Sequence, residues 1–175
     1  INEWACSVAI EAMGGEAARP LAEMVDVVLE ELREERDSRL LAVQVEAERR
    51  GLPFLWDDDE VSVGYGKYSR TWARQELPGS SEVDWDSLKA VPVVLVTGTN
   101  GKTTTSRMLA RIVKQAGLTP GASSTDGLYV NEQALELGDW TGPGAARTIL
   151  RHADVDVAIL ETARGGILRR GLGVM

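Results

Sequence analysis

Apolar residues repeat at helical spacing three times in the N-terminal part of the chain. The three stretches are residues 1–13, 21–32 and 38–50. Gly14, Gly15 and Gly51 follow the first and third stretches, as glycine follows many helices. Extended hydrophobic runs at residues 52–56 and 61–68 then predict two strands. We therefore expect a small α/β module over residues 1–76.

The second half of the chain alternates strand and helix patterns. Strands are predicted at residues 93–96, 121–124 and 155–160, helices at 103–116 and 144–152, and a hairpin at 127–130 and 133–135 around Asn131-Glu132. This alternation is typical of an α/β fold with a parallel, doubly wound sheet. Residues 77–90 combine turn formers with an acidic stretch, which predicts a linker before a second domain that starts at residue 91.

The net charge of the chain indicates which classes of binding partner are unfavourable. The chain of 175 residues has 27 acidic and 19 basic side chains and a formal net charge of −8. Nucleic acids and anionic membranes favour basic surfaces, so we expect neither as a partner. Cys6 is the only cysteine, which excludes an intrachain disulfide, and neither a signal peptide nor a long apolar span is apparent, so we expect a cytoplasmic protein. A homo-oligomer is left open. Because the chain starts at Ile1 and stops at Met175 within an apolar stretch, we also expect a fragment of a longer protein.

Residues 57–60 are four consecutive carboxylates and invite a metal-site interpretation. Neighbouring side chains in an extended segment or a tight turn cannot all converge on one ion. We therefore favour a solvated turn between two strands.

The stretch with the clearest chemistry is the turn after the strand at residues 93–96. Its sequence is Thr97-Gly98-Thr99-Asn100-Gly101-Lys102-Thr103-Thr104, and a helix is predicted to begin at its end. The free N–H groups and positive dipole end of such a helix favour a phosphate group. Lys102 is placed to neutralise the outer phosphates, and the Thr103 hydroxyl to ligate Mg²⁺. We predict an ATP-binding loop formed by Gly98, Thr99, Asn100, Gly101, Lys102, Thr103 and Thr104 in a P-loop NTPase-type sheet. The alternative is a glycine-rich turn with an incidental lysine.

Polar residues also follow the other predicted strands of this domain. Glu161 ends the apolar run 157–160, and Thr125-Asp126 follow the strand at 121–124. The carboxyl ends of parallel strands share one edge of a sheet, which is where α/β sheets bind ligands. We predict Mg²⁺ ligation by Thr103, Thr125 and Glu161, and catalytic roles for Lys102 and Glu161. Glu161 is alternatively a charge at the start of a following helix.

These segments resemble the Mur ligase family, ATP-dependent ligases that join amino acids to peptidoglycan precursors, folates and related acceptors. The strict motif G-x-x-x-x-G-K-[ST] fails because Val96 replaces its first glycine, whereas residues 97–104 resemble the variant loop of this family. Residues 125–127 (T-D-G), 138–143 (G-D-W-T-G-P) and 160–169 (L-E-T-A-R-G-G-I-L-R) resemble the middle region of cyanophycin synthetases in the same order. The resemblance is strong over residues 91–173 and weaker over 47–70.

The resemblance implies an ATP-dependent ligase that activates a carboxylate as an acyl phosphate, which an amino acid amine then attacks to form an amide. It implies ATP and Mg²⁺ as cofactors, and a small-molecule or peptide carboxylate and an amino acid as partners. Candidate substrate residues are Asp126, Asp139, Thr141, Arg164 and Arg169. The segment 138–143 is alternatively a helix cap.

The chain departs from cyanophycin synthetases in one respect. In that family an ATP-grasp domain follows the segment that resembles residues 64–68, whereas here only residues up to Ala90 separate this segment from the ligase loop. The family's C-terminal domain would lie after Met175, so we expect the 175-residue chain alone not to ligate. The sequence specifies neither acceptor nor amine. A non-catalytic ATP-binding regulatory or scaffold protein, and a P-loop kinase or hydrolase, are the alternatives.

Overall fold

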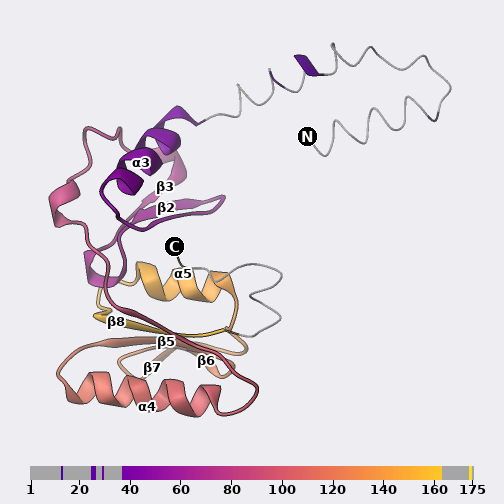
Figure 1. Ribbon diagram of the computed structural model, residues 1–175, viewed down its shortest axis with the longest axis vertical. Helices are drawn as coiled ribbons and strands as arrows, with labels where there is room; N and C mark the ends of the chain where they lie inside the picture. The colour runs from indigo at the N-terminus through magenta and orange to yellow at the C-terminus, as the bar shows by residue number, and fades with distance from the viewer. Residues whose placement is uncertain (1–12, 14–24, 27–28, 30–36, 163–173, 175) are drawn as a thin grey trace. The chain divides into compact units, whose positions relative to one another are not determined.

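The computed structural model describes residue 13, residues 25, 26 and 29, residues 37–162 and residue 174 (Figure 1). The chain divides into two compact units, residues 1–38 and 39–175. Nearly all of the two helices predicted within residues 1–32 lies outside the described residues, so the account below concerns the second unit. The linker expected at residues 77–90 and a domain boundary there stay predictions.

The first part of this unit is a helix packed on a small antiparallel sheet. It contains α3 (Ser38–Arg49), β1 (Phe54–Trp56), β2 (Glu60–Val63) and β3 (Arg70–Ala73), with strand order β1-β2-β3. Side chains alternate across the strands, so Phe54, Val61 and Val63 pack with Val43 and Ala47 of α3 in one core. Leu77, Val83 and Leu88, within the segment predicted as a linker, are buried in the same core.

Three short 3₁₀ helices follow, one between β2 and β3 and two between β3 and the second part. They are η1 (Gly66–Tyr68), η2 (Arg74–Glu76) and η3 (Trp85–Ser87). Around η1 the backbones approach closely: the Lys67 N–H donates to the Val155 carbonyl at 2.9 Å, and the Tyr65 N–H to the Lys89 carbonyl at 2.9 Å.

The second part is a five-stranded sheet with strand order β4-β8-β5-β6-β7. Its strands are β4 (Val93–Val96), β5 (Pro120–Ser124), β6 (Gly127–Val130), β7 (Gln133–Leu137) and β8 (Val157–Glu161), and its helices are α4 (Lys102–Gln115) and α5 (Pro143–Arg151). Every element predicted in this half is present, with small shifts of its ends.

The sheet is mixed: it contains the predicted parallel strands together with the predicted hairpin. Strands β4, β8 and β5 are parallel, but β6 and β7 add to β5 in antiparallel orientation. The reason is the length of the connections. Two residues link β5 to β6, and Asn131-Glu132, with φ of 50° and 67°, link β6 to β7. Connections this short cannot cross the sheet to start a parallel strand.

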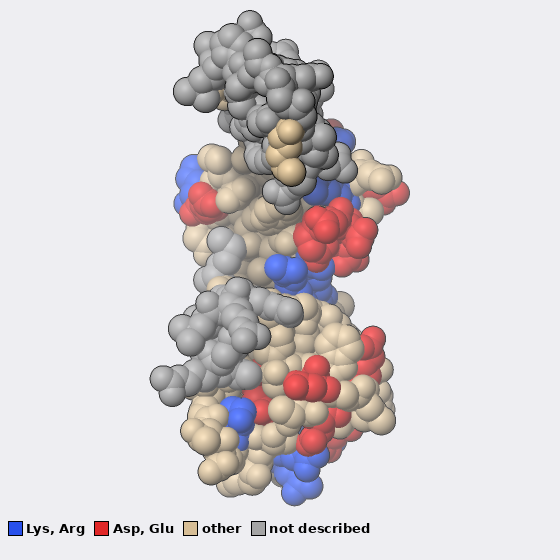
Figure 2. Space-filling model, turned by 90° about the vertical axis from the view of Figure 1, so that its right-hand side faces the viewer, with Lys and Arg blue, Asp and Glu red and all other residues tan. Residues whose placement is uncertain are grey.

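The helices α4 and α5 cover opposite faces of this sheet (Figure 1). Along β8, Val157 and Ile159 belong to the core under α4, whereas Ala158 and Leu160 belong to the core with α5. By the same alternation Glu161, the next residue, faces the α4 side. Within the described part of the chain, no helix is long and apolar enough to cross a membrane. On the face shown in Figure 2, acidic and basic side chains lie in small adjacent groups.

Candidate functional site

The turn between β4 and α4 has the backbone of an anion-binding loop. Gly101 precedes the helix in left-handed conformation, with φ of 78°, and Gly98 has a φ of 146°. Both values favour glycine, which explains why the loop has glycine at these positions. No side chain caps the N-terminus of α4, and the first bond into the helix runs from the Thr105 N–H to the Gly101 carbonyl at 2.9 Å. The preceding N–H groups are therefore available to an anion.

Three of the predicted ligand residues meet beside this loop. The Thr103 hydroxyl donates to Glu161 Oε2 at 3.0 Å and lies 3.1 Å from the Thr125 hydroxyl. Lys102 Nζ is 3.8 Å from Glu161 Oε1. These residues come from α4, from the end of β8 and from the turn after β5, so the expected convergence at one sheet edge is present.

Strand pairing explains the position of Glu161. Val96 and Glu161 are register partners in the parallel pair β4–β8, and the Thr162 N–H continues the ladder to the Val96 carbonyl at 2.9 Å. The first turn of α4 follows Val96 after only five loop residues. The carboxylate is thereby held under the start of the helix, where only 2% of Glu161 is exposed.

One atom of this group accepts no hydrogen bond, although Lys102 Nζ lies 3.8 Å from it. Glu161 Oε1 is buried and makes no hydrogen bond within the described part of the chain. A buried carboxylate oxygen without a hydrogen bond is costly unless a cation or another donor compensates it. One carboxylate with two hydroxyls suits Mg²⁺, which keeps several waters and takes few protein ligands when it accompanies a polyphosphate. Among the described residues, no group of three or more His, Cys, Asp or Glu side chains is arranged to hold a metal.

Asp126 has a partner that the sequence analysis missed. Arg107 of α4 donates to Asp126 Oδ2 at 2.7 Å, and both side chains are exposed. Arg107 lies four residues, about one helical turn, after Thr103, so both side chains lie on one face of α4. This spacing could have indicated from the sequence that Arg107 lies near the predicted ligand residues.

Asp139 and Thr141 bind each other rather than the Thr103 group. The Thr141 hydroxyl donates to Asp139 Oδ1 at 2.9 Å. The alternative prediction, that a side chain of this segment caps the next helix, is wrong. The residue before α5 is Gly142, and no side chain forms a capping hydrogen bond there. Trp140 packs against the core under α5. Arg164 and Arg169 lie outside the described residues, so their predicted contact with substrate stays a prediction.

The acidic segment 57–60 forms an ordered turn. Asp57 Oδ1 accepts the N–H groups of Glu60 at 2.8 Å and Asp59 at 3.2 Å, and Asp57 Oδ2 accepts from Arg151 at 2.8 Å. Partial burial acts to raise the pKa of Asp57, but the bonds from the Glu60 N–H and Arg151 outweigh it, and the pKa lies below its ordinary value. The turn prediction is confirmed, although Asp57 is less solvated than expected.

Comparison with known proteins identifies the family that the C-terminal half of the chain resembles. Residues 96–173 match the Mur ligase middle domain. A cyanophycin synthetase of Synechocystis sp. is 61% identical over 82 residues, which are 47% of this chain and 9% of that protein. A cyanophycin synthetase of Crocosphaera subtropica is 55% identical over 87 residues, 50% of this chain and 10% of that protein.

A more distant similarity extends the match. The UDP-N-acetylmuramoylalanine–D-glutamate ligase of a Synechococcus strain is 35% identical over 125 residues, which are 62% of this chain and 26% of that protein. The matched region thus spans about a tenth of each cyanophycin synthetase and a quarter of this ligase. The resemblance predicted from the loop and strand-end motifs is confirmed.

Proposed function

Since residues 96–173 match the Mur ligase middle domain, we propose that this region binds ATP with Mg²⁺ and serves an amide-forming ligase. The single observation that supports the proposal most is the group at Glu161. A buried carboxylate, one oxygen of which accepts no hydrogen bond, lies beside an uncapped helix start, a lysine and two hydroxyls. A purely structural glycine-rich turn does not account for that group.

The residues of the chain then have separate roles. The N–H groups at the start of α4, with Gly98 and Gly101 allowing close approach, hold the phosphate chain. Lys102, whose side chain is 18% exposed, lies where its ammonium group can stabilise charge on the terminal phosphate. Thr103, Thr125 and Glu161 would hold Mg²⁺. When bound, Mg²⁺ orients the phosphates and neutralises charge that develops on them.

The substrates follow from the same proposal. A carboxylate acceptor takes the terminal phosphoryl group of ATP and releases ADP; an amino acid amine then displaces phosphate from the acyl group and forms an amide. Asp126 is proposed to contact one of these substrates, since it follows β5 directly after Thr125. Cyanophycin synthetases and the UDP-N-acetylmuramoylalanine–D-glutamate ligase are the relatives on which the ligase class rests.

The first experiment measures MgATP binding to the chain by titration calorimetry. Binding should weaken at least about tenfold, or 1.4 kcal/mol, in Lys102→Ala and in Thr103→Val, whereas the matched variant Thr103→Ser keeps the hydroxyl and binds like the wild type. Equal binding by Thr103→Val and Thr103→Ser would contradict the role of the hydroxyl.

The second experiment measures ADP release by the complete protein that its gene encodes. Aspartyl and glutamyl acceptors are combined with single amino acids, and each mixture is repeated without the amine. Turnover that requires both substrates and is lost in Lys102→Ala supports the ligase. Tight MgATP binding without co-substrate-dependent turnover would instead favour a nucleotide-binding regulatory protein, and phosphate release without an amine would favour a hydrolase.

A further inference from the structure

The turn that carries Thr125 is short and exposed. Thr125 and Asp126 are the two residues between β5 and β6, and both are exposed. Hydrogen bonds attach this turn to the strands: the Asp126 N–H donates to the Ser124 hydroxyl at 3.2 Å, and the Gly138 N–H donates to the Asp126 carbonyl at 3.2 Å. These bonds hold the turn to the hairpin, but they do not fix its distance from α4, which carries Thr103.

A pocket of about 460 Å³ lies next to this turn, between α4 and the hairpin of β5 and β6. Side chains of α4, among them Thr104 and Arg107, form one wall, and residues of β5, β6 and the turn after β6 form the other. Close packing of apolar side chains ordinarily fixes the distance between a helix and a sheet. The pocket takes the place of such packing here, so this distance depends on the polar contacts that cross from α4 to the hairpin.

Ion pairs join α4 to the hairpin at both ends of the pocket. At the end next to the phosphate loop, Arg107 donates to Asp126 Oδ2 at 2.7 Å. At the other end, Glu132 pairs with Lys114 and lies 3.8 Å from Arg111. The first pair holds the turn between β5 and β6 against the first half of α4.

We propose that Arg107 is a positioning residue of the proposed Mg²⁺ site. By holding Asp126, Arg107 keeps the hydroxyl of the neighbouring Thr125 at 3.1 Å from the Thr103 hydroxyl. Adjacent oxygen ligands of Mg²⁺ are about 3 Å apart, since each lies about 2.1 Å from the ion in octahedral geometry. A small shift of the turn would therefore take Thr125 out of range. The inference rests on the proposed function and adds a residue that acts on the site without touching the ion.

The first test is the Mg²⁺ dependence of ATP binding, measured by titration calorimetry. The affinity of the chain for ATP is measured in EDTA and at a series of Mg²⁺ concentrations. Because exposed ion pairs contribute little energy, the Mg²⁺ midpoint in Arg107→Gln should rise about threefold, whereas the affinity in EDTA should stay the same. Arg107→Lys keeps the charge and should restore most of the wild-type midpoint. The double variant Arg107→Gln, Asp126→Asn should be no weaker than Arg107→Gln. An unchanged midpoint in Arg107→Gln, or an equal loss with and without Mg²⁺, would overturn the proposal.

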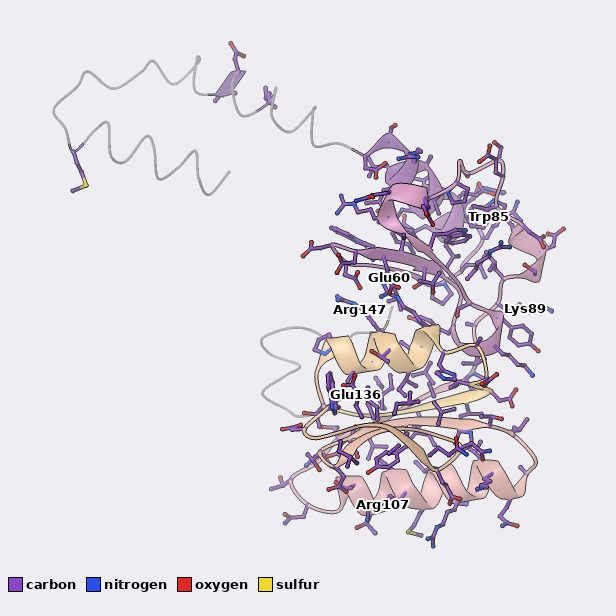
Figure 3. All side chains as sticks on the ribbon, turned by 180° about the vertical axis from the view of Figure 1, so that it is seen from behind. Glu60, Trp85, Lys89, Arg107, Glu136 and Arg147 are labelled. Carbon is purple, nitrogen blue, oxygen red and sulfur yellow. The ribbon has the colours of Figure 1, made fainter. Side chains whose placement is uncertain are left out.

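Two arginine variants serve as controls. Arg111→Gln changes a residue one turn further along α4 that also lines the pocket and is also mostly exposed, and it should leave the Mg²⁺ midpoint unchanged. Figure 3 shows Arg107 on α4, on the opposite side of the sheet from Arg147, so Arg147→Gln should have no effect either. If Arg111→Gln raised the midpoint as much as Arg107→Gln, the charge of α4 rather than the position of Thr125 would be responsible, and the proposal would be wrong.

A second measurement separates this proposal from the proposed function. NMR relaxation of the Thr125 methyl group in the ligand-free chain reports how firmly the turn is held, without any nucleotide. The order parameter of this methyl group should fall in Arg107→Gln and stay unchanged in Arg111→Gln. If the order falls as expected but the wild type does not bind MgATP, Arg107 positions Thr125 and the proposed function fails. If MgATP binds but Arg107→Gln changes neither the order nor the Mg²⁺ midpoint, the positioning role is wrong and the proposed function stands.

Discussion

Val96 and Glu161 stand opposite each other at the carboxyl ends of β4 and β8, paired in parallel register. This pairing fixes a carboxylate next to the loop that starts one residue after Val96. Glu161 is nevertheless almost completely buried, and one of its oxygens has no hydrogen-bond partner among the described residues. Lys102 Nζ, 3.8 Å from that oxygen, compensates part of this buried charge, and a bound cation would compensate it further.

Glu161→Gln should lower both stability and ligand binding. The amide carries no charge to pair with Lys102, whose Nζ lies 3.8 Å from Glu161 Oε1, so the free energy of unfolding of the ligand-free chain should fall by about 1 kcal/mol. The same change should weaken Mg²⁺-dependent ATP binding. Urea unfolding without ligand measures the first effect, and calorimetry with and without Mg²⁺ measures the second. A fall in stability together with unchanged MgATP affinity would show that Glu161 is a structural residue.

Gly66→Ala should destabilise the chain far more than Gly51→Ala. Both glycines have left-handed φ, 60° and 66°. A Cβ at Gly66 would lie 2.4 Å from the Val155 carbonyl oxygen, whereas a Cβ at Gly51 would meet nothing within 4 Å. We expect a loss of about 1 kcal/mol at Gly51 from backbone strain alone, and about 3 kcal/mol at Gly66, where overpacking adds to it. Thermal and urea unfolding of the two variants provide the comparison; equal losses would mean that η1 moves away from Val155 without cost.

The ion pair between Lys67 and Asp156 predicts a dependence of stability on pH. Lys67 Nζ lies 2.6 Å from Asp156 Oδ1, and this contact, followed by a bond from the Thr119 N–H, lowers the pKa of Asp156 from its ordinary 3.8. A lowered pKa in the folded state stabilises the fold above the unfolded value, and the contribution is lost as pH falls below 3.8 through the folded value. Asp156→Asn should make the decline in free energy of unfolding shallower in that acid range.

Asp154→Asn is the matched control. It removes an exposed carboxylate from the same turn, and Lys67 does not pair with that carboxylate. Unfolding by urea at a series of acid pH values measures both variants. If Asp156→Asn and wild type decline in parallel, the Lys67 contact does not persist in solution.

Arg151→Met should weaken the attachment of the small sheet to α5. Arg151 is 12% exposed at its side chain and donates to Asp57 Oδ2 and Glu60 Oε2, each at 2.8 Å, and to the Ser62 hydroxyl at 3.1 Å. Methionine keeps the apolar stem but leaves these acceptors unpaired. Because Asp57 and Glu60 are partly exposed, we expect a loss of about 2 kcal/mol, below the cost of breaking a fully buried pair. Arg147→Met, on the same helix, should change stability by less than about 0.5 kcal/mol.

The sequence predicted the parts of the fold that depend on short-range chemistry. The loop at 97–104 and the hairpin turn at Asn131-Glu132 follow from glycine and asparagine tolerating left-handed backbone. The strand-end position of Glu161 follows from its place after an apolar run. These features are encoded within a few residues, so the pattern of the chain is sufficient to find them.

Long-range partners were not predictable in the same way. The bond between Arg107 and Asp126 joins residues 19 positions apart, and the bond between Arg151 and Asp57 joins residues 94 positions apart. Such contacts depend on the order β4-β8-β5-β6-β7, which hydrophobic patterns do not specify. The predicted substrate roles of Asp139 and Thr141 were inferred from the resemblance of their loop to the family. In the structure these two side chains form a hydrogen bond with each other.

The contacts of Arg151 and η1 also determine which movements the molecule can make. A rotation of the small sheet away from α5 would break the bonds to Asp57, Glu60 and Ser62 together with the backbone bond from Lys67 to Val155. These contacts therefore disfavour a role of the small sheet as a hinged lid over residues 97–104. A movement that closes over residues 97–104 would then come from segments other than β1, β2 and β3.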